Sequence, residues 1–484
     1  MALGEVDYGL MGVVGGLTAF VTFLNGIMAG GIGRFYAISI GAMRKDPEKG
    51  LDECHRWFTT AVVVHTILPV ILMLIGYPIG EWAVRHFLTI PPDRIRACVW
   101  VWRCVCVSTF VGMVGVPFSA WYGAKQEIAE LTIYSFVTTT LNVFFMYYAV
   151  HHPGDWLVPL ACWQMLLSVA PQLIICSRAG VLYPECRFVW RYVMTTWNRI
   201  KKMMGYSGWV LLGTLGDILS GQGICVLVNK YFGPKYNAAQ NIGNTLSGHC
   251  NTLSGSLIGA FWPAIMNAYG AGDIDLMRKL VYRVCKIGTV CVLIFAIPMA
   301  VEVDEILLLW LKNPPQYAAG LCVLALIVAI IDKTTYGYAI AVHATGKLAE
   351  YQSVVASLFL TALPIAWVFF HYGFSIYYAG VALIIARGFC AMARLVMARK
   401  HTGLQFWYWV RHIGAPLGLM MALSVFAGCS VVSLMPASFI RLVVTTVACE
   451  MIILPLSWFL LFEEPERMFV MCKVNKFLHR GEKP

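Results

Sequence analysis

Length, composition and charge place this chain among membrane proteins. It has 484 residues, of which 59% are hydrophobic and 13% charged, and its mean hydropathy is +0.71, outside the range of soluble globular domains. The net charge of +11 would suggest a nucleic-acid partner in a soluble protein. Here the basic residues follow the loops between apolar segments, so we expect no nucleic-acid partner.

Apolar windows long enough to cross a bilayer core recur along the whole chain. They predict about thirteen transmembrane helices, because a membrane helix needs about 20 residues and no window shows the sustained alternation of a membrane barrel. We therefore expect an all-α polytopic membrane protein. The windows are 9–31, 58–80, 96–120, 129–150, 156–178, 207–229, 237–262, 279–301, 317–336, 350–371, 376–398, 411–434 and 437–462.

Most Lys and Arg residues lie in alternate loops, and the positive-inside rule places those loops in the cytoplasm. This orientation puts residues 1–8 outside and the C-terminus in the cytoplasm. The outside loops, such as 151–155 and 371–375, are too short for a soluble catalytic domain. The chain has no Walker-type phosphate loop and no cluster with metal-ligand spacing. We expect a protein that is not an enzyme and that uses no cofactor and no metal.

The longest polar connection, residues 179–206, divides the chain. Its core, 187–204, places Val189, Met194, Trp197 and Ile200 on one face, which predicts an amphipathic helix on the cytoplasmic membrane surface. The predicted parts are a five-helix N-terminal lobe at 1–178, an amphipathic cytoplasmic linker at 179–206, a six-helix C-terminal lobe at 207–400, an appended helix pair at 401–462 and a cytoplasmic basic tail at 463–484.

A weak internal repeat relates the two lobes. Residues 3–16 align with 232–244, and both segments open a glycine-rich span that runs into a charged loop. The span 207–229 precedes the second copy and has no counterpart before the first. This predicts that one helix is absent from the N-terminus of the sequence.

Arg34, in "AGGIGRFYAIS" at 29–39, stands in a run that is otherwise apolar or small. Charges inside membrane spans are rare and costly, so they suggest function. The preceding Gly30-Gly31-Ile32-Gly33 predicts a kink or an unwound turn. Two interpretations stay open for Arg34: a ligand in a transport cavity, or an anchor at the cytoplasmic interface.

Few other charges fall within the predicted spans. Arg103 is interpreted as an interfacial anchor, and Glu450 is expected to have a structural partner. Asp217, at mid-span, either binds a coupling Na⁺ or H⁺ or serves as an internal partner for an arginine such as Arg387. Asp332 and Lys333 lie near a span end.

A polar stripe runs along residues 237–254. Its spacing of three and four lays the side chains along one helix face, with His249 and Gln240 off its edge. Either the stripe makes hydrogen bonds between helices, with Gly243, Gly248, Gly255 and Gly259 allowing close packing, or it lines a cavity. The members are Asn237, Asn241, Asn244, Ser247, Asn251 and Ser254.

Several stretches together resemble the polysaccharide flippases of the multidrug/oligosaccharidyl-lipid/polysaccharide exporter superfamily, and in particular the O-antigen or capsule repeat-unit translocases of lipopolysaccharide biosynthesis. They are "LGEVDYGLMGVVGGLTAFVTFLNGIMAGGIGRF", "LTIPPDRI", "VGVPFSAWYGAKQEI" and "GQGICVLVNKYFGPKYNAAQNI". In that family a further helix precedes the segment that matches "LGEVDYG", and this sequence lacks it.

The resemblance implies two pseudo-symmetric lobes around a central cavity that opens alternately to each side of a bacterial inner membrane. The cargo would be an undecaprenyl-pyrophosphate-linked oligosaccharide, with membrane lipids, a coupling H⁺ or Na⁺ and a polysaccharide polymerase as further partners. Arg34 occupies the place of a cavity arginine that holds pyrophosphate in related flippases, and the polar stripe would suit sugar hydroxyls. The candidate cavity residues are Arg34, Asn241, Asn244, His249, Asn251 and Arg387, and Asp217 is the candidate for ion coupling.

Three alternatives remain. A multidrug cation antiporter of the same superfamily would need acidic rather than basic cavity groups. A membrane glycosyltransferase or O-antigen polymerase would need a substantial outside loop. An inactive, truncated remnant would explain the absent first helix.

Overall fold

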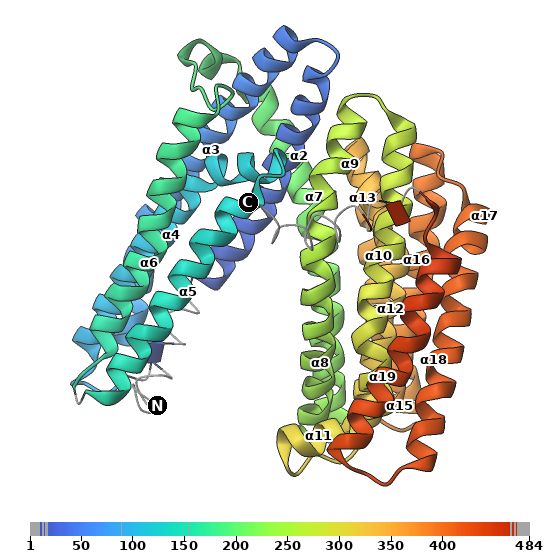
Figure 1. Ribbon diagram of the computed structural model, residues 1–484. Helices are drawn as coiled ribbons and strands as arrows, with labels where there is room; N and C mark the ends of the chain where they lie inside the picture. The colour runs from blue at the N-terminus through green and yellow to red at the C-terminus, as the bar shows by residue number, and fades with distance from the viewer. Residues whose placement is uncertain are drawn as a thin grey trace, which may run out of the picture. The chain divides into compact units, whose positions relative to one another are not determined.

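The computed structural model describes residues 10–11, 14, 18–88, 90–152, 154–464, 467–468 and 471. Within these residues the ordered elements are helices, and none is a β-strand, so the all-α prediction is confirmed (Figure 1). Ten of the described helices are long and apolar enough to cross a membrane, or eleven if a bent pair counts as one span. The predicted repeat at 3–16 lies outside the described residues apart from 10, 11 and 14.

The chain forms two compact units. Unit 1 extends to Leu211 and also contains Met266–Gly272, while unit 2 contains Leu212–Ile265 and the chain from Asp273 onward. The chain passes from unit 2 to unit 1 after Ile265 and returns to unit 2 after Gly272. Seven residues from the second half of the sequence, at a short helix, therefore belong to unit 1. Arg34, which lies in unit 1, therefore shares its unit with the sequence-distant segment Met266–Gly272.

Unit 1 is a helical bundle in which α4 packs along α6, and α2 packs against both α3 and α4. Pro47–Trp82 is longer than the predicted span 58–80 because Asp46 caps its start, accepting a hydrogen bond from the Lys49 backbone N–H at 3.2 Å. The elements are α2 Ala19–Met43, α3 Pro47–Trp82, η1 Ala83–Phe87, α4 Ile95–Ala124, α5 Ile128–His151, α6 Leu157–Leu182 and η2 Trp190–Thr195.

The connection between α6 and the next span differs from its prediction. The expected amphipathic helix over 187–204 is instead the short 3-10 helix η2 followed by α7, Trp197–Phe232, which continues into the membrane span without a break. The hydroxyls of Thr195 and Thr196 bind carbonyls three residues back, at 3.0 and 2.8 Å, which favours the tighter 3-10 turn. Trp190, Met194 and Trp197 remain largely exposed.

Unit 2 is built around α10, α12 and α16, which pack on one another, with α8 against α10 and α12. In α7, a Cβ at Gly216 would come within 2.7 Å of the Ala356 Cα, so this glycine lets α14 approach closely. The elements after α7 are α8 Pro234–Gly259, α9 Phe261–Gly270, α10 Ile274–Val301, α11 Val303–Leu311, α12 Ala318–Thr334, α13 Tyr336–Thr345, α14 Leu348–Leu360, α15 Ala362–His371, α16 Tyr378–Thr402, α17 Phe406–Trp409, η3 Val410–Gly414, α18 Ala415–Leu434, α19 Phe439–Leu456 and η4 Ser457–Leu461.

The last helices, α18 and α19, pair with each other and pack on α10. Buried Glu302, at the end of α10, binds Arg441 through both carboxylate oxygens at 2.8–3.2 Å and accepts a hydrogen bond from Thr445 at 2.7 Å. Glu450 was expected to have a structural partner, but its Oε1 is buried without a hydrogen bond among the described residues. The acid that holds α19 is therefore Glu302.

Fifteen cysteines lie in the described part of the chain, and all are free thiols. Cys104 and Cys106, the close pair in the sequence, are both buried in unit 1. Cys162 on α6 and Cys429 on α18 are exposed.

Candidate functional site

Arg34 lies on α2 in unit 1, and its side chain is 6% exposed. The unwound turn that was one expectation at Gly30–Gly33 is wrong, because α2 continues as one helix from Ala19 to Met43. Gly31 serves close packing instead: a Cβ there would come within 2.8 Å of the Ser207 Oγ on α7. The glycine brings α7, and with it Tyr206, next to Arg34.

The Arg34 guanidinium lies against aromatic rings. Its Cζ is 5.0 Å from the centre of the Phe35 ring and 4.9 Å from that of Tyr206. Phe35 stacks on Trp57 of α3 at 4.0 Å and meets Tyr206 edge-on at 5.9 Å. Such cation–π contacts stabilise a desolvated guanidinium by about 2 kcal/mol. Rings of α2, α3 and α7 thus stabilise a buried positive charge.

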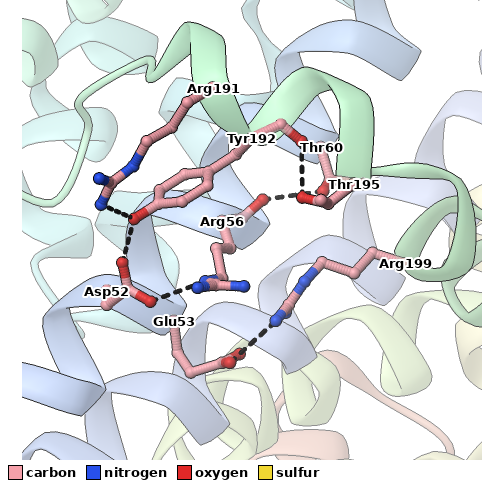
Figure 2. Close-up of polar contacts among 8 residues, drawn as sticks. All are labelled: Asp52, Glu53, Arg56, Thr60, Arg191, Tyr192, Thr195 and Arg199. Carbon is pink, nitrogen blue, oxygen red and sulfur yellow. Dashed lines mark hydrogen bonds and ion pairs between the residues drawn. The ribbon is translucent and has the colours of Figure 1, made fainter.

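A polar network fixes α3 to the chain around η2 and to the start of α7 (Figure 2). Arg199 binds Glu53 through two hydrogen bonds of 2.8 Å and also lies over the Trp57 ring, at 4.9 Å. Asp52 binds Arg56 at 2.7 Å and accepts a hydrogen bond from the Tyr192 hydroxyl. The network therefore positions Trp57, the ring on which Phe35 stacks.

The segment Met266–Gly272 closes against α2 and α4. A Cβ at Gly41 would come within 2.1 Å of the Asn267 carbonyl oxygen, and one at Gly270 within 2.2 Å of the Ile38 carbonyl oxygen. Asn267 also donates a hydrogen bond of 3.4 Å to the Ala124 carbonyl. Tyr269, in the same segment, interacts electrostatically with Arg34. No sequence pattern predicted this contact, and the two glycines were the available signal for it.

In unit 2, Arg387 on α16 forms an ion pair with Asp217 on α7, and its Cζ lies 4.0 Å from the centre of the Phe359 ring. Of the two interpretations of Asp217, the structure shows the internal partner of Arg387. The Asp217 side chain is 48% exposed, whereas that of Arg387 is 15% exposed.

A second pair lies in the same electrostatic network. Arg394 of α16 binds the Asp332 side chain at 2.8 Å, and the Lys333 Nζ lies 4.9 Å from the centre of the Tyr336 ring. Lys333 interacts electrostatically with both ion pairs. The network thus has three cations and two carboxylates, at the 45° bend between α12 and α13. Sequence reasoning missed Arg394, which lies close to a span end.

The polar stripe of α8 makes few contacts with other helices. Gln240 donates to Asn244 at 3.4 Å and Asn251 donates to Ser247 at 3.5 Å, both within α8. The contact to another helix is with Cys225 of α7, whose Sγ lies 3.6 Å from the Asn241 Oδ1. Asn241, Asn244 and His249 are exposed.

The glycines of α8 do not behave as the packing interpretation expects. Gly243 approaches the Leu321 carbonyl of α12, but an added Cβ at Gly248, Gly255 or Gly259 would meet nothing within 4 Å. Among the described residues, the packing interpretation is therefore supported at one of the four glycines. Of the six stripe members, Asn241 and Asn244 are exposed, whereas Ser254 is buried.

The predicted residues are divided between the units. Arg34 belongs to unit 1, and Asp217, Asn241, Asn244, His249, Asn251 and Arg387 belong to unit 2. Within unit 2, Asp217 and Arg387 meet directly, and Asn241 and Asn244 both approach Cys225. Among the described residues, no group of three or more His, Cys, Asp or Glu side chains could hold a metal ion.

Comparison with known proteins gives a match at the level of structure. The sequence matches no protein-family model and no curated protein sequence. A multidrug-resistance MATE-family transporter of the MOP superfamily, in an outward-facing conformation, superposes with a TM-score of 0.63 at 13% identity, over 83% of this chain and 90% of that one. The chain has the fold of a membrane transporter.

Two further structures agree. A Vibrio cholerae MATE transporter gives a TM-score of 0.61 at 15% identity, over 84% of this chain and 93% of the other. A MOP-superfamily transporter from Pyrococcus furiosus gives 0.62 at 15% identity, over 83% and 91%, and is described as having a binding pocket of reverse polarity that suggests a different function. At these identities the likeness concerns the fold.

Proposed function

We propose that this protein transports an anionic, lipid-linked oligosaccharide across the bacterial inner membrane by alternating access. The cargo class is an undecaprenyl-pyrophosphate-linked repeat unit destined for lipopolysaccharide or capsule. The observation that carries the proposal is the sign of the buried charges: Arg34 in unit 1, and three cations against two carboxylates in the unit 2 network.

Chemistry links these charges to a pyrophosphate. A guanidinium stays charged and binds phosphate oxygens through two parallel hydrogen bonds. Arg34 lies against aromatic rings, which stabilise a desolvated guanidinium. We assign Arg34 to the pyrophosphate, and we assign the exposed Asn241, Asn244 and His249 and the half-buried Asn251 of α8 to sugar hydroxyls. Asp217, through its pair with Arg387, is the proposed site at which H⁺ or Na⁺ couples to transport.

The test is complementation of a bacterial strain that lacks its own polysaccharide flippase. Expression of the chain should restore surface polysaccharide, and purified protein in liposomes should move a fluorescent lipid-pyrophosphate saccharide between leaflets. Insertion of the wild-type chain in the membrane is checked first, so that loss of transport is separated from loss of folding. Absence of both activities from a correctly inserted wild-type chain would refute the proposal.

Multidrug antiport is the second candidate function, because two of the structural neighbours above are MATE transporters and one is a multidrug-resistance protein. An antiporter of cationic drugs needs a carboxylate to receive its substrate, and Asp217 is engaged with Arg387. Efflux of a cationic dye that is driven by a Na⁺ or proton gradient, and lost in Asp217→Asn, would favour this candidate. Dye accumulation equal to that of empty cells would favour the anionic cargo.

A further inference from the structure

A cavity of about 310 Å³ lies within unit 2, where α7 ends and α8 and α12 begin. We call it the tyrosine pocket, and it is separate from the charged network at the α12–α13 bend. The neighbouring Lys230 and Lys312 belong to loops that the positive-inside rule places outside, so the pocket lies at the predicted outer end of the unit. Its lining residues are Tyr231, Phe232, Tyr236, Tyr317, Ser375 and Ile376.

Aromatic rings form most of the wall. Tyr236 lies 5.6 Å from Tyr317 and 6.1 Å from Phe232, measured between ring centres. Tyr317 also meets Tyr377 edge-on at 5.5 Å. Tyr side chains combine an apolar ring with a polar hydroxyl. Within the described part of the chain, the hydroxyls of Tyr231, Tyr236 and Tyr317 make no hydrogen bond.

Tyr317 has an unusual backbone. Its φ of 71° and ψ of −7° place it in the left-handed region, directly before α12. That conformation costs a residue with a Cβ about 1–2 kcal/mol, and Gly or Asn would adopt it more readily. Strain of this kind is found at binding sites, where the surrounding structure holds it. Here it directs an aromatic ring toward Tyr236 and the cavity.

The lining also defines the ligand. Of the six described lining side chains none is charged, and the Lys230 Nζ lies 5.9 Å from the centre of the Tyr231 ring. This lining favours a neutral group. A cavity of about 310 Å³ has room for one sugar ring. A pyranose presents C–H faces that stack on aromatic rings and hydroxyls that bond to Tyr and Ser hydroxyls. Both kinds of contact are available in this pocket.

We propose that the tyrosine pocket binds a neutral pyranose unit of the transported oligosaccharide at the outer end of unit 2. This inference rests on the proposed function, because it assumes a cargo that carries sugar. Arg34 is the residue assigned to the phosphate end of the cargo, and the tyrosine pocket would hold one sugar. The pocket would thereby contribute to the choice among oligosaccharides.

The experiment measures sugar binding and transport separately. Purified full-length protein is titrated with methyl glycosides of glucose, galactose, mannose, rhamnose and N-acetylglucosamine, and binding is followed by saturation-transfer NMR. Wild type should bind at least one of them. Tyr317→Gly removes the ring but keeps a residue suited to the left-handed backbone, so it should fold normally and bind about tenfold more weakly.

Two further variants control the result. Tyr236→Ala should also weaken binding, whereas Tyr372→Ala, which changes an exposed tyrosine of the nearby 371–375 loop that does not line the pocket, should leave binding unchanged. No binding by any glycoside, or equal binding by wild type, Tyr317→Gly and Tyr236→Ala, overturns the pocket assignment. Complementation by wild type without glycoside binding refutes the pocket alone. Glycoside binding that needs Tyr317, without complementation, refutes the proposed function alone.

Discussion

Unit 1 and unit 2 both bury arginines, but they surround them differently. Arg34 in unit 1 lies against the rings of Phe35 and Tyr206. Arg387 and Arg394 in unit 2 each bind a carboxylate, Asp217 and Asp332. Rings stabilise a cation without cancelling its charge, whereas a carboxylate neutralises it. Unit 1 thus surrounds its buried arginine with aromatic rings, whereas unit 2 uses ion pairs to hold its helices together.

The largest effect is expected from breaking a unit 2 pair. Arg394→Met leaves Asp332 buried without its partner, which should lower the free energy of unfolding by about 4 kcal/mol. The double variant Arg394→Met/Asp332→Leu removes both charges and should recover most of that loss. Thermal unfolding of the purified protein in detergent measures both. A double variant as unstable as the single one would contradict a purely structural role for the pair.

The next largest effect should come from Arg34. Arg34→Ala should reduce transport about a hundredfold, because it removes a charge-assisted contact with phosphate worth about 3 kcal/mol. Arg34→Lys keeps the charge without the planar fork and should retain part of the activity. Surface polysaccharide is the measurement, and Arg103→Ala, at a half-exposed arginine, is the control. Normal polysaccharide in Arg34→Ala would make Arg34 an anchor and remove the difference between the units.

The contact of Met266–Gly272 with α2 should be sensitive to one methyl group. A Cβ at Gly41 would meet the Asn267 carbonyl oxygen at 2.1 Å, so Gly41→Ala should cost about 2 kcal/mol of stability through overpacking. Gly33→Ala, on the same helix, meets nothing within 4 Å and should be tolerated. Comparing the melting temperatures of the two variants tests whether unit 1 requires this contact. Equal melting temperatures would exclude such a requirement.

The smallest effect is expected at the polar network of Figure 2. Tyr192→Phe removes the hydroxyl that donates to Asp52 and accepts from Arg191. The expected loss is about 1 kcal/mol, because Asp52 keeps its pair with Arg56. Thermal unfolding again provides the measurement, with Tyr134→Phe, whose hydroxyl bonds within α5, as a comparison. A loss as large as that of Arg394→Met would show that this network matters as much as the pairs of unit 2.

The sequence indicated the membrane helices and most of the charged side chains within them. Hydrophobic windows are local, so composition alone predicts membrane helices at 279–301 and 376–398, where the structure has Ile274–Val301 and Tyr378–Thr402. Arg34, Asp217 and Arg387 stand out for the same reason, since a charge in an apolar run is visible without any neighbour. The identity of their partners is not local.

What surrounds each charge could not be predicted in this way. Trp57 and Tyr206, which complete the surroundings of Arg34, come from other helices, and the Asp332 partner Arg394 lies on α16. Two glycines behave in the opposite way to their sequence interpretation. Gly31, interpreted as part of a hinge, packs against α7, and Gly248, interpreted as a packing position, has nothing within 4 Å of an added Cβ. Whether a glycine serves backbone flexibility or close helix packing can be decided only when its neighbours are known. The left-handed Tyr317 carries no sequence signal of this kind.

The positions of the exposed cysteines allow a distance between the two units to be measured. Each unit exposes one native cysteine, Cys162 on α6 and Cys429 on α18, among the described residues. Spin labels at these two positions would form a natural pair for pulsed electron paramagnetic resonance, with Cys162→Ser and Cys429→Ser as single-label references. The distribution of distances between the labels, recorded with and without a candidate cargo, would show whether the two units move when the cargo is added.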